Sequence, residues 1–154
     1  MAIEIEKKFL VKNNDFKNNA NPVLLRQGYL STSCEGIVRV RRYDDKGFIT
    51  IKGKTSNCTR AEYEYSIPVE DVDNMLDNLC TKPIIEKVRY FLVYKGFEWV
   101  VDEFLGVNEG LVVAEIELSD EKQDFEKPDW LGREITSDIR YYNSNLVQNP
   151  YNTW

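Results

Sequence analysis

The sequence predicts a mainly β domain of the α+β class, with eight antiparallel strands forming a barrel or a sandwich and a few flanking helices. Apolar and polar residues alternate with a period of two through most of the chain, which is typical of strands with two chemically different faces. Turn signals such as Asp44-Asp45-Lys46-Gly47 and Lys95-Gly96 separate these segments. Helical periodicity is confined to connections. Many short strands in a small domain favour a closed or two-layered β fold.

The first expected strand shows the pattern most clearly, because Glu4, Glu6 and Lys8 alternate with apolar Ile3 and Ile5. In an extended strand these three charges point to one side. Similar alternation defines the full set of expected strands, which covers residues 2–11, 23–32, 35–43, 47–54, 59–67, 84–95, 97–104 and 110–118.

Three connections carry a helical pattern. Residues 69–80 begin with acidic Glu70 and Asp71, which favour a helix N-terminus, and then space their apolar residues along one face. Residues 120–126 and 138–147 predict two more helices, each ended by a following proline.

The length of 154 residues predicts a single domain spanning 1–154. A net charge of −6 argues against nonspecific binding to nucleic acid or to an anionic membrane. No segment approaches the roughly 20 apolar residues of a membrane helix, and no secretory signal precedes the first strand. We therefore expect neither a nucleic-acid partner nor a membrane partner.

Histidine is absent from the sequence, which excludes a Ser-His-Asp triad, a Cys-His pair and any histidine-ligated metal. Cys34, Cys58 and Cys80 are widely spaced and match neither a disulfide framework nor a zinc site. They are interpreted as reduced thiols of a cytoplasmic protein. Catalysis or metal binding must then use carboxylates, Lys, Arg, Tyr or Cys.

One face of the expected sheet carries charges of both signs. Its carboxylates are Glu4, Glu6, Glu62, Glu64, Asp102, Glu115 and Glu117. Its cations are Lys8, Arg39, Arg41, Lys52, Arg60, Lys87 and Arg89. A solvated outer face is the simplest interpretation, since exposed ion pairs are common there.

Two observations favour an inward orientation of this charged face instead. The opposite face carries the bulky residues Phe9, Tyr63, Tyr65, Tyr90 and Trp99, which are suited to packing under helices. The charged face is also rich in arginine, which binds phosphate in a bidentate manner. Charges facing inward must be paired, hydrated or bound to a ligand. Carboxylates at i and i+2 supply oxygen ligands for Mg²⁺ or Mn²⁺, and the cations suit a chain of phosphates.

The ordered set Glu4-x-Glu6-x-Lys8, Arg39/Arg41, Lys52, Arg60-x-Glu62-x-Glu64, Lys87-x-Arg89, Asp102 and Glu115-x-Glu117 resembles the CYTH superfamily of triphosphate tunnel metalloenzymes. Residues 25–30 and 138–146 resemble its compact bacterial inorganic triphosphatase branch. The resemblance implies an eight-stranded antiparallel β-barrel tunnel with a charged interior and outer helices. It also implies a divalent-metal-dependent hydrolase of linear triphosphates.

Carried onto this chain, the resemblance assigns two sets of residues. The metal ligands are Glu4, Glu6, Glu115 and Glu117, with Glu62, Glu64 and Asp102 as further ligands or water-orienting groups. The substrate clamp is Lys8, Arg39, Arg41, Lys52, Arg60, Lys87 and Arg89. For the reaction itself, we expect Glu4, Glu115 or a nearby carboxylate to orient the attacking water, and Lys87 and Arg89 to stabilise the developing charge. Tyr29, beside Arg26 and Gln27, is a further catalytic candidate near a barrel mouth.

The expected reaction is hydrolysis of inorganic tripolyphosphate to pyrophosphate and phosphate with Mg²⁺ or Mn²⁺, with nucleoside triphosphate as a companion substrate. A class IV adenylate cyclase and a thiamine triphosphatase are alternatives within the superfamily. A noncatalytic module that binds polyphosphate or nucleotide is an alternative of another class, and a barrel that binds an apolar molecule is a third. Exposed terminal aromatic residues would also allow a homodimer.

Overall fold

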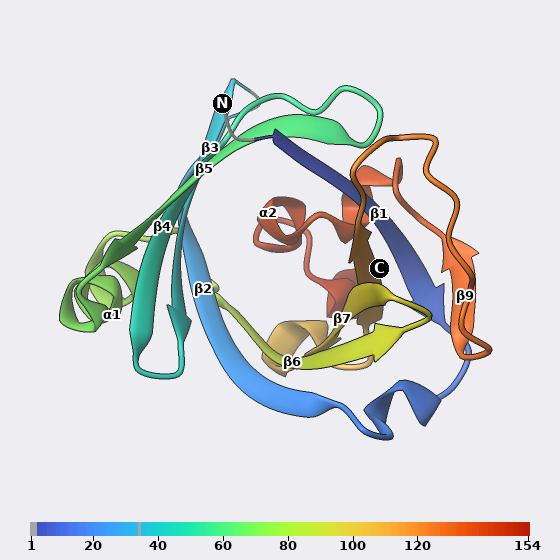
Figure 1. The fold of residues 1–154 in the computed structure, drawn as a ribbon. Helices are drawn as coiled ribbons and strands as arrows, with labels where there is room; N and C mark the ends of the chain where they lie inside the picture. Colours follow the sequence, from blue (N-terminus) through green and yellow to red (C-terminus); the bar gives the residue numbers. More distant parts are fainter. Residues whose placement is uncertain (1–2, 34) are drawn as a thin grey trace.

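The computed structural model describes residues 3–33 and 35–154. Within these residues, eight antiparallel strands close into a barrel and a ninth strand pairs beside it (Figure 1). The strands are β1 (Ile3–Val11), β2 (Asn21–Ser33), β3 (Gly36–Tyr43), β4 (Lys46–Lys52), β5 (Thr59–Ile67), β6 (Ile85–Tyr94), β7 (Phe97–Phe104), β8 (Val112–Glu117) and β9 (Leu131–Glu134). The predicted β fold is confirmed, as a barrel rather than a sandwich.

The barrel closes through β1, because its two edges pair with different strands. The strand order is β5-β4-β3-β2-β6-β7-β8-β1, and β1 also pairs with β5. On one edge the Leu118 N–H donates to the Ile5 carbonyl, and on the other the Glu6 N–H donates to the Cys58 carbonyl. The second edge is shared between β5, near Glu4, and β9, near Phe9. Closure of this kind leaves the ring without a free edge.

Two of the predicted turns connect neighbouring strands directly. Lys95 and Gly96 both have positive φ, at 49° and 82°, and join β6 to β7. Such a pair suits a two-residue hairpin whose twist matches that of the strands. Asp44, with φ of 56°, lies between β3 and β4. These turns fix the register that points alternate side chains into the barrel.

The longest helix, α1 (Val69–Asn78), lies outside the barrel against β3 and β4 (Figure 1). Its buried residues Val72 and Leu76 pack with Val40 of β3, which confirms the helix predicted over 69–80. The other helical segments are the 3₁₀ turns η1 (Asp15–Lys17), η2 (Gly106–Asn108), η3 (Ile139–Tyr141) and η4 (Tyr151–Thr153), and the short helix α2 (Asn143–Leu146). None of the helices within 3–33 and 35–154 is long and apolar enough to cross a membrane.

Two of the predicted helices were wrong. Residues 120–126 form a turn and an extended segment, because the Gln123 side chain accepts hydrogen bonds from Ser119 and Phe125 is anchored on the aromatic core. Residues 138–147 are divided into η3 and α2, since Tyr142 between them has an extended backbone. Local side-chain hydrogen bonds, such as those that Gln123 accepts from Ser119, compete with helix formation.

The sequence also failed to predict β9, a strand of four residues that contains Gly132. The outward-facing aromatic residues were expected to pack under helices, and the structure corrects this expectation. Phe9 and Trp99 are buried and pack edge to face beside the segment that carries Phe125. Tyr65, in contrast, is 58% exposed.

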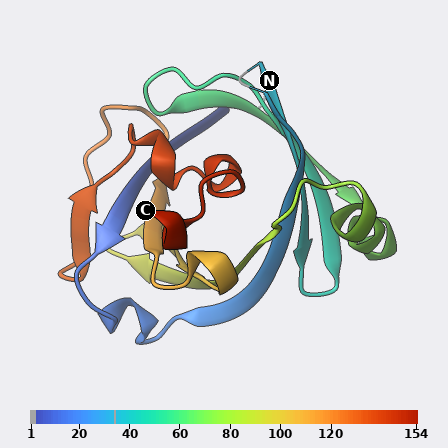
Figure 2. The ribbon, with the colours of Figure 1, turned by 180° about the vertical axis from the view of Figure 1, so that it is seen from behind.

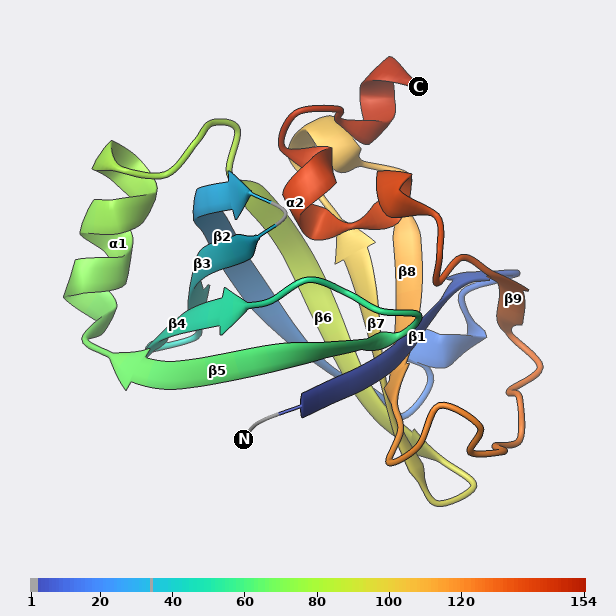
Figure 3. The same cartoon turned by 90° about the horizontal axis from the view of Figure 1, so that it is seen from above.

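The C-terminal segment lies across one end of the barrel. Figures 1 and 2 look along the barrel from its two ends, and in both views this segment, in red, lies within the ring. The side view in Figure 3 shows α2 at one end rather than midway along the strands. Leu146 and Val147 are buried with Ile85 and Phe104 of the wall, so an apolar cluster holds the segment in place.

Glycine at position 28 allows close packing between β2 and the end of α1. A Cβ atom there would lie 2.8 Å from the Cβ of Cys80, so no larger side chain fits without a shift. Cys58 and Cys80 are free thiols, consistent with the expectation, whereas Cys34 lies outside the described residues.

Candidate functional site

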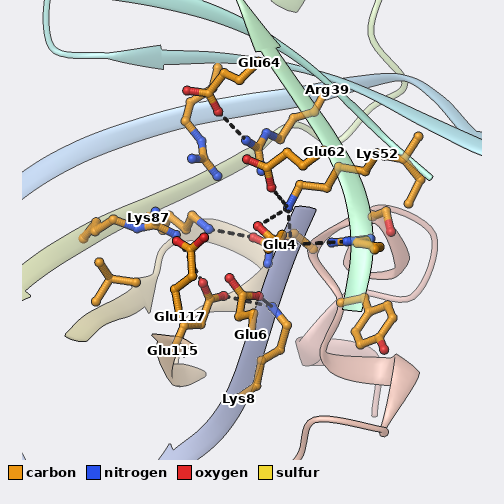
Figure 4. Close-up of a pocket in the computed structure, with 18 of the residues that line it drawn as sticks. Glu4, Glu6, Lys8, Arg39, Lys52, Glu62, Glu64, Lys87, Glu115 and Glu117 are labelled. Carbon is orange, nitrogen blue, oxygen red and sulfur yellow. Dashed lines mark hydrogen bonds and ion pairs between the residues drawn. The ribbon is translucent and has the colours of Figure 1, made fainter. Parts of the chain in front are cut away.

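A cavity of about 310 Å³ lies inside the barrel and is lined mainly by charged side chains (Figure 4). Its cations are Lys8, Arg39, Arg41, Lys52, Arg60, Lys87 and Arg89. Its carboxylates are Glu4, Glu6, Glu62, Glu64, Glu98, Glu115 and Glu117. The charged face therefore points inward, and the interpretation as a solvated outer face was wrong. An apolar ligand would not suit this lining.

The period of two in the sequence explains why these residues converge. Every second side chain of a strand faces the same way, and antiparallel pairing sets these side chains opposite one another. Glu4 is paired in register with Arg60, and Lys52 with Glu62. Lys8 is paired with Glu115. Several charged side chains of this face are thus paired in register with a residue of opposite charge.

The first group of ion pairs surrounds Glu4. The Lys52 Nζ lies 3.1 Å from both Glu4 carboxylate oxygens and 3.3 Å from Glu62. The Arg60 Nε donates to the same Glu4 carboxylate at 3.3 Å. Burial and the nearby Arg39 nevertheless lower the pKa of Lys52 below its ordinary value.

The second group surrounds Lys8, whose Nζ lies 2.9 Å from Glu115 and 3.1 Å from Glu6. Burial alone would lower the pKa of Lys8, but the two carboxylates outweigh it and raise the pKa. Burial likewise opposes ionisation of Glu115, and Lys8 and Arg89 outweigh that effect, holding its pKa well below the usual range. Glu115 is therefore ionised at neutral pH.

Asp102 lies behind the cavity wall rather than on it. It is 1% exposed, its two oxygens accept hydrogen bonds from Arg89 at 2.7 and 2.9 Å, and the Lys87 Nζ lies 2.7 Å away. Burial raises the pKa of Asp102, but the two cations prevail and lower it to about 2. Both oxygens are thus committed to protein cations. The structure does not bring Asp102 to the position expected of a metal ligand.

Glu6 and Glu117 are like charges that face each other directly across β1 and β8. Burial raises the pKa of Glu6, and the adjacent Glu115 raises it further, against the opposing effect of Lys8. Burial, Glu4 and Glu6 raise the pKa of Glu117. Like charges in this arrangement repel one another unless a cation lies between them.

The donor set at this point fits a hard divalent cation. Carboxylate oxygens are the ligands that Mg²⁺ and Mn²⁺ prefer, and the repulsion between Glu6 and Glu117 is what such an ion relieves. Within 3–33 and 35–154, no three carboxylate or thiol side chains are already gathered closely enough to form a metal cluster. The carboxylates instead contact Lys8, Lys52 and Arg60, which a metal ion would displace in part.

Arg41 and Lys87 each donate to a neutral amide, and Lys87 also pairs with Asp102. The Arg41 Nε donates to the Gln27 Oε1 at 2.9 Å, and the Lys87 Nζ donates to the Asn143 Oδ1 at 2.8 Å. Burial and the nearby Arg39 lower the pKa of Arg41 to about 9, and burial lowers that of Lys87 to about 7. Tyr29, the predicted catalytic tyrosine, lines the cavity and accepts a hydrogen bond from Gln27 Nε2 at 3.1 Å.

All the predicted site residues except Asp102 line the cavity. The sequence pattern left out Glu98, although it lies on the same face of β7 as Asp102. Tyr142, Asn143 and Ser144 also line the cavity, although the sequence predicted no more for them than part of the helix over 138–147. Neutral polar residues outside an alternating strand carry no such signal.

The sequence and the fold are similar to those of known proteins. The CYTH domain model matches residues 2–151. An inorganic triphosphatase of Acetivibrio thermocellus is 56% identical over 151 residues, covering 98% of this chain and 97% of that protein. An inorganic triphosphatase of Nitrosomonas europaea is 37% identical over 149 residues, covering 94% and 96%. A solved structure of an inorganic triphosphatase superposes with a TM-score of 0.68 at 35% identity, covering 96% of this chain and 95% of that one.

Proposed function

The chain belongs to the CYTH family, and we propose that its charged tunnel hydrolyses inorganic tripolyphosphate to pyrophosphate and phosphate with the help of Mg²⁺ or Mn²⁺. The observation that carries this proposal is the lining of the cavity, in which cations able to bind phosphate oxygens alternate with carboxylates able to bind a metal. The two relatives named inorganic triphosphatase support the same reaction.

The balance of charge supports the requirement for a metal. Among the described residues, the cavity is lined by equal numbers of cations and carboxylates. A triphosphate brings several further negative charges, which this lining leaves unneutralised. A divalent cation bound by the carboxylates supplies that neutralisation and a more acidic water for attack.

The cations of the chain position the substrate. Arg39, Arg41 and Lys52 come from adjacent strands and present their donors to one cavity, which suits the oxygens of consecutive phosphates. Arg89 is held by Asp102, so its guanidinium is oriented before substrate arrives. Phosphoryl transfer needs mainly such positioning and charge stabilisation.

Attack by water on the terminal phosphorus breaks one P–O–P bond and releases pyrophosphate. In this proposal Glu115, kept ionised by Lys8, accepts a hydrogen bond from the attacking water, and Glu4 is the alternative acceptor. Lys87 and Arg89 stabilise the charge that develops on the leaving group. Tyr29 lines the same cavity.

A substrate panel tests the proposal. Tripolyphosphate, ATP and thiamine triphosphate are incubated with the protein and Mg²⁺ or Mn²⁺, and the products are identified by ³¹P NMR. We expect release of phosphate and pyrophosphate that is fastest from tripolyphosphate. Formation of cyclic AMP from ATP would assign a cyclase instead, and binding of tripolyphosphate without any product would assign a binding module.

Action in the cytoplasm and assembly as a homodimer stay predictions from the sequence. The free thiols of Cys58 and Cys80 are consistent with a reducing compartment. The mass of the protein in solution, measured by light scattering, tests the homodimer.

A further inference from the structure

Gln27 of β2 is a fully buried neutral amide behind the cavity lining, in contact with Arg41, Tyr29 and Asn143, which line the cavity. Its exposed fraction is 0%, and it is paired in register with Arg41 of β3. Its Oε1 accepts from the Arg41 Nε at 2.9 Å, and its Nε2 donates to the Tyr29 hydroxyl at 3.1 Å and to the Asn143 Oδ1 at 3.3 Å. A buried amide is tolerated when its hydrogen bonds are made in this way.

The direction of these hydrogen bonds is determined by the charged partners. A guanidinium or an ammonium group can only donate, so the oxygen of Gln27 must face Arg41 and the oxygen of Asn143 must face Lys87. The Gln27 Nε2 is then left to donate to the Asn143 Oδ1. The two amides form one connected unit that links the barrel wall to α2 and contacts one cation at each end.

This unit differs from the carboxylates that hold the other cations. Arg60 contacts the Glu4 carboxylate, and Arg89 contacts Asp102. Within the described part of the chain, Arg41 has no carboxylate partner, and Lys87 shares Asp102 with Arg89. An amide oxygen orients a cation by its dipole, whereas a carboxylate also cancels its charge.

We propose that Gln27 and Asn143 are positioning residues: the Gln27 amide oxygen orients Arg41 without neutralising it, and the Asn143 amide oxygen orients the ammonium group of Lys87, which also pairs with Asp102, so that both cations can bind phosphate oxygens of the triphosphate. This inference rests on the proposed function and adds to it. The lowered pKa of Arg41, caused by burial and by nearby Arg39 and Arg89, agrees with positive charge that has few partners in the absence of substrate.

Two substitutions of the same residue separate this role from a structural one. Gln27→Glu has nearly the same shape and keeps an acceptor for Arg41, but it adds a negative charge. Gln27→Met removes the hydrogen bonds and adds no charge. A structural role predicts that the Glu variant is the milder of the two. The positioning role predicts the reverse for phosphate binding, because the carboxylate pairs with Arg41.

The experiment measures KM and kcat for tripolyphosphate with saturating Mg²⁺, and the thermal shift that tripolyphosphate causes in EDTA. We expect KM to rise about tenfold for Gln27→Met, as for loss of one charge-assisted hydrogen bond, and more for Gln27→Glu. Asn143→Asp and Asn143→Ala, at a less buried position, should follow the same order. The exposed Gln148→Met is the matched control and should leave KM unchanged.

A Glu variant that binds tripolyphosphate as well as the Met variant or better, or two variants with unchanged KM, would overturn the inference while leaving the proposed function intact. If the wild-type protein hydrolyses no tripolyphosphate, the proposed reaction fails instead. The thermal shifts in EDTA then still rank the variants for phosphate binding, so the two failures are distinguishable.

Discussion

Asp102 and the pair formed by Glu6 and Glu117 are carboxylates of the same barrel interior, but their surroundings shift their pKa values in opposite directions. Asp102 is enclosed by Lys87 and Arg89, which lower its pKa to about 2. Glu6 and Glu117 face each other across two strands, and both have a raised pKa. The first carboxylate stabilises the folded protein as it stands. The ionised forms of Glu6 and Glu117 destabilise the folded protein until a cation binds between them, which indicates a functional rather than a structural role.

The largest expected effect is on the structural side of this comparison. Asp102→Asn leaves two buried cations without their shared carboxylate, and breaking a buried pair in this way costs about 3–5 kcal/mol. We expect urea unfolding to show a loss of that size in the free energy of unfolding. A variant as stable as the wild type would mean that Asp102 is not the structural carboxylate.

Glu6→Gln gives the next largest effect, on the functional side. Loss of a ligand to the metal and of its charge is expected to slow metal-dependent hydrolysis of tripolyphosphate about 100-fold or more. The same variant should unfold in EDTA no earlier than the wild type, because one of two repelling charges is gone. Assays of phosphate release check the loss of activity, and thermal unfolding in EDTA checks the stability. A fully active Glu6→Gln variant would contradict the assignment of Glu6 as a metal ligand.

The pH dependence of stability without metal gives a smaller effect. The folded pKa of Glu117 is raised above its ordinary value of 4.5, so its ionised form destabilises the protein at pH values above the folded pKa. As the pH falls through the folded pKa toward 4.5, the native carboxyl takes up a proton before the unfolded chain does, and the cost disappears.

We therefore expect Glu117→Gln to be more stable than the wild type in EDTA at neutral pH, and the difference to shrink as the pH falls toward 4.5. Asp102 does not interfere in this range. Its folded pKa is depressed, and its stabilising contribution is lost only as the pH falls through 3.8 toward about 2. A difference that is constant with pH would show that Glu117 does not titrate in this way.

The smallest effect is expected at Glu103, the outward neighbour of Asp102 on β7. Its ion pair with Lys17 is 2.9 Å long, but both side chains are about one third exposed, at 31% and 35%. Exposed pairs of this kind contribute less than about 1 kcal/mol. Glu103→Gln is therefore the matched control for Asp102→Asn in urea unfolding. If both variants lost a similar free energy of unfolding, the buried ion pairs of Asp102 would be no more stabilising than the exposed ion pair of Glu103.

Much of this arrangement was predictable from the sequence, because alternation in a strand determines which residues share a face. The convergence of Glu4, Glu6 and Lys8 with the arginine pair of β3 needed only the period of two and the closure of the barrel. The distinction between Asp102 and Glu117 was not predictable, since it depends on which cations lie across the next strand.

Other features escaped prediction for different physical reasons. Gln27 and Asn143 are neutral, and their role depends on a contact between β2 and a segment more than 100 residues later. The four-residue β9 is too short to show alternation, and it forms because β1 offers an edge beyond β5. The residues over 120–126 carry helix-forming side chains, but packing of Phe125 on Phe9 and Trp99 determines their path.

The most direct test of the central claim is phosphate release from tripolyphosphate by the wild-type protein and by Glu117→Gln, measured across a titration of Mg²⁺ and again in excess EDTA. We predict rapid release by the wild type with metal, none in EDTA, and release by the variant that is slower by about 100-fold at every Mg²⁺ concentration. Release that persists in EDTA, or a variant as fast as the wild type, would contradict the assignment of the carboxylates of β1 and β8 to metal binding.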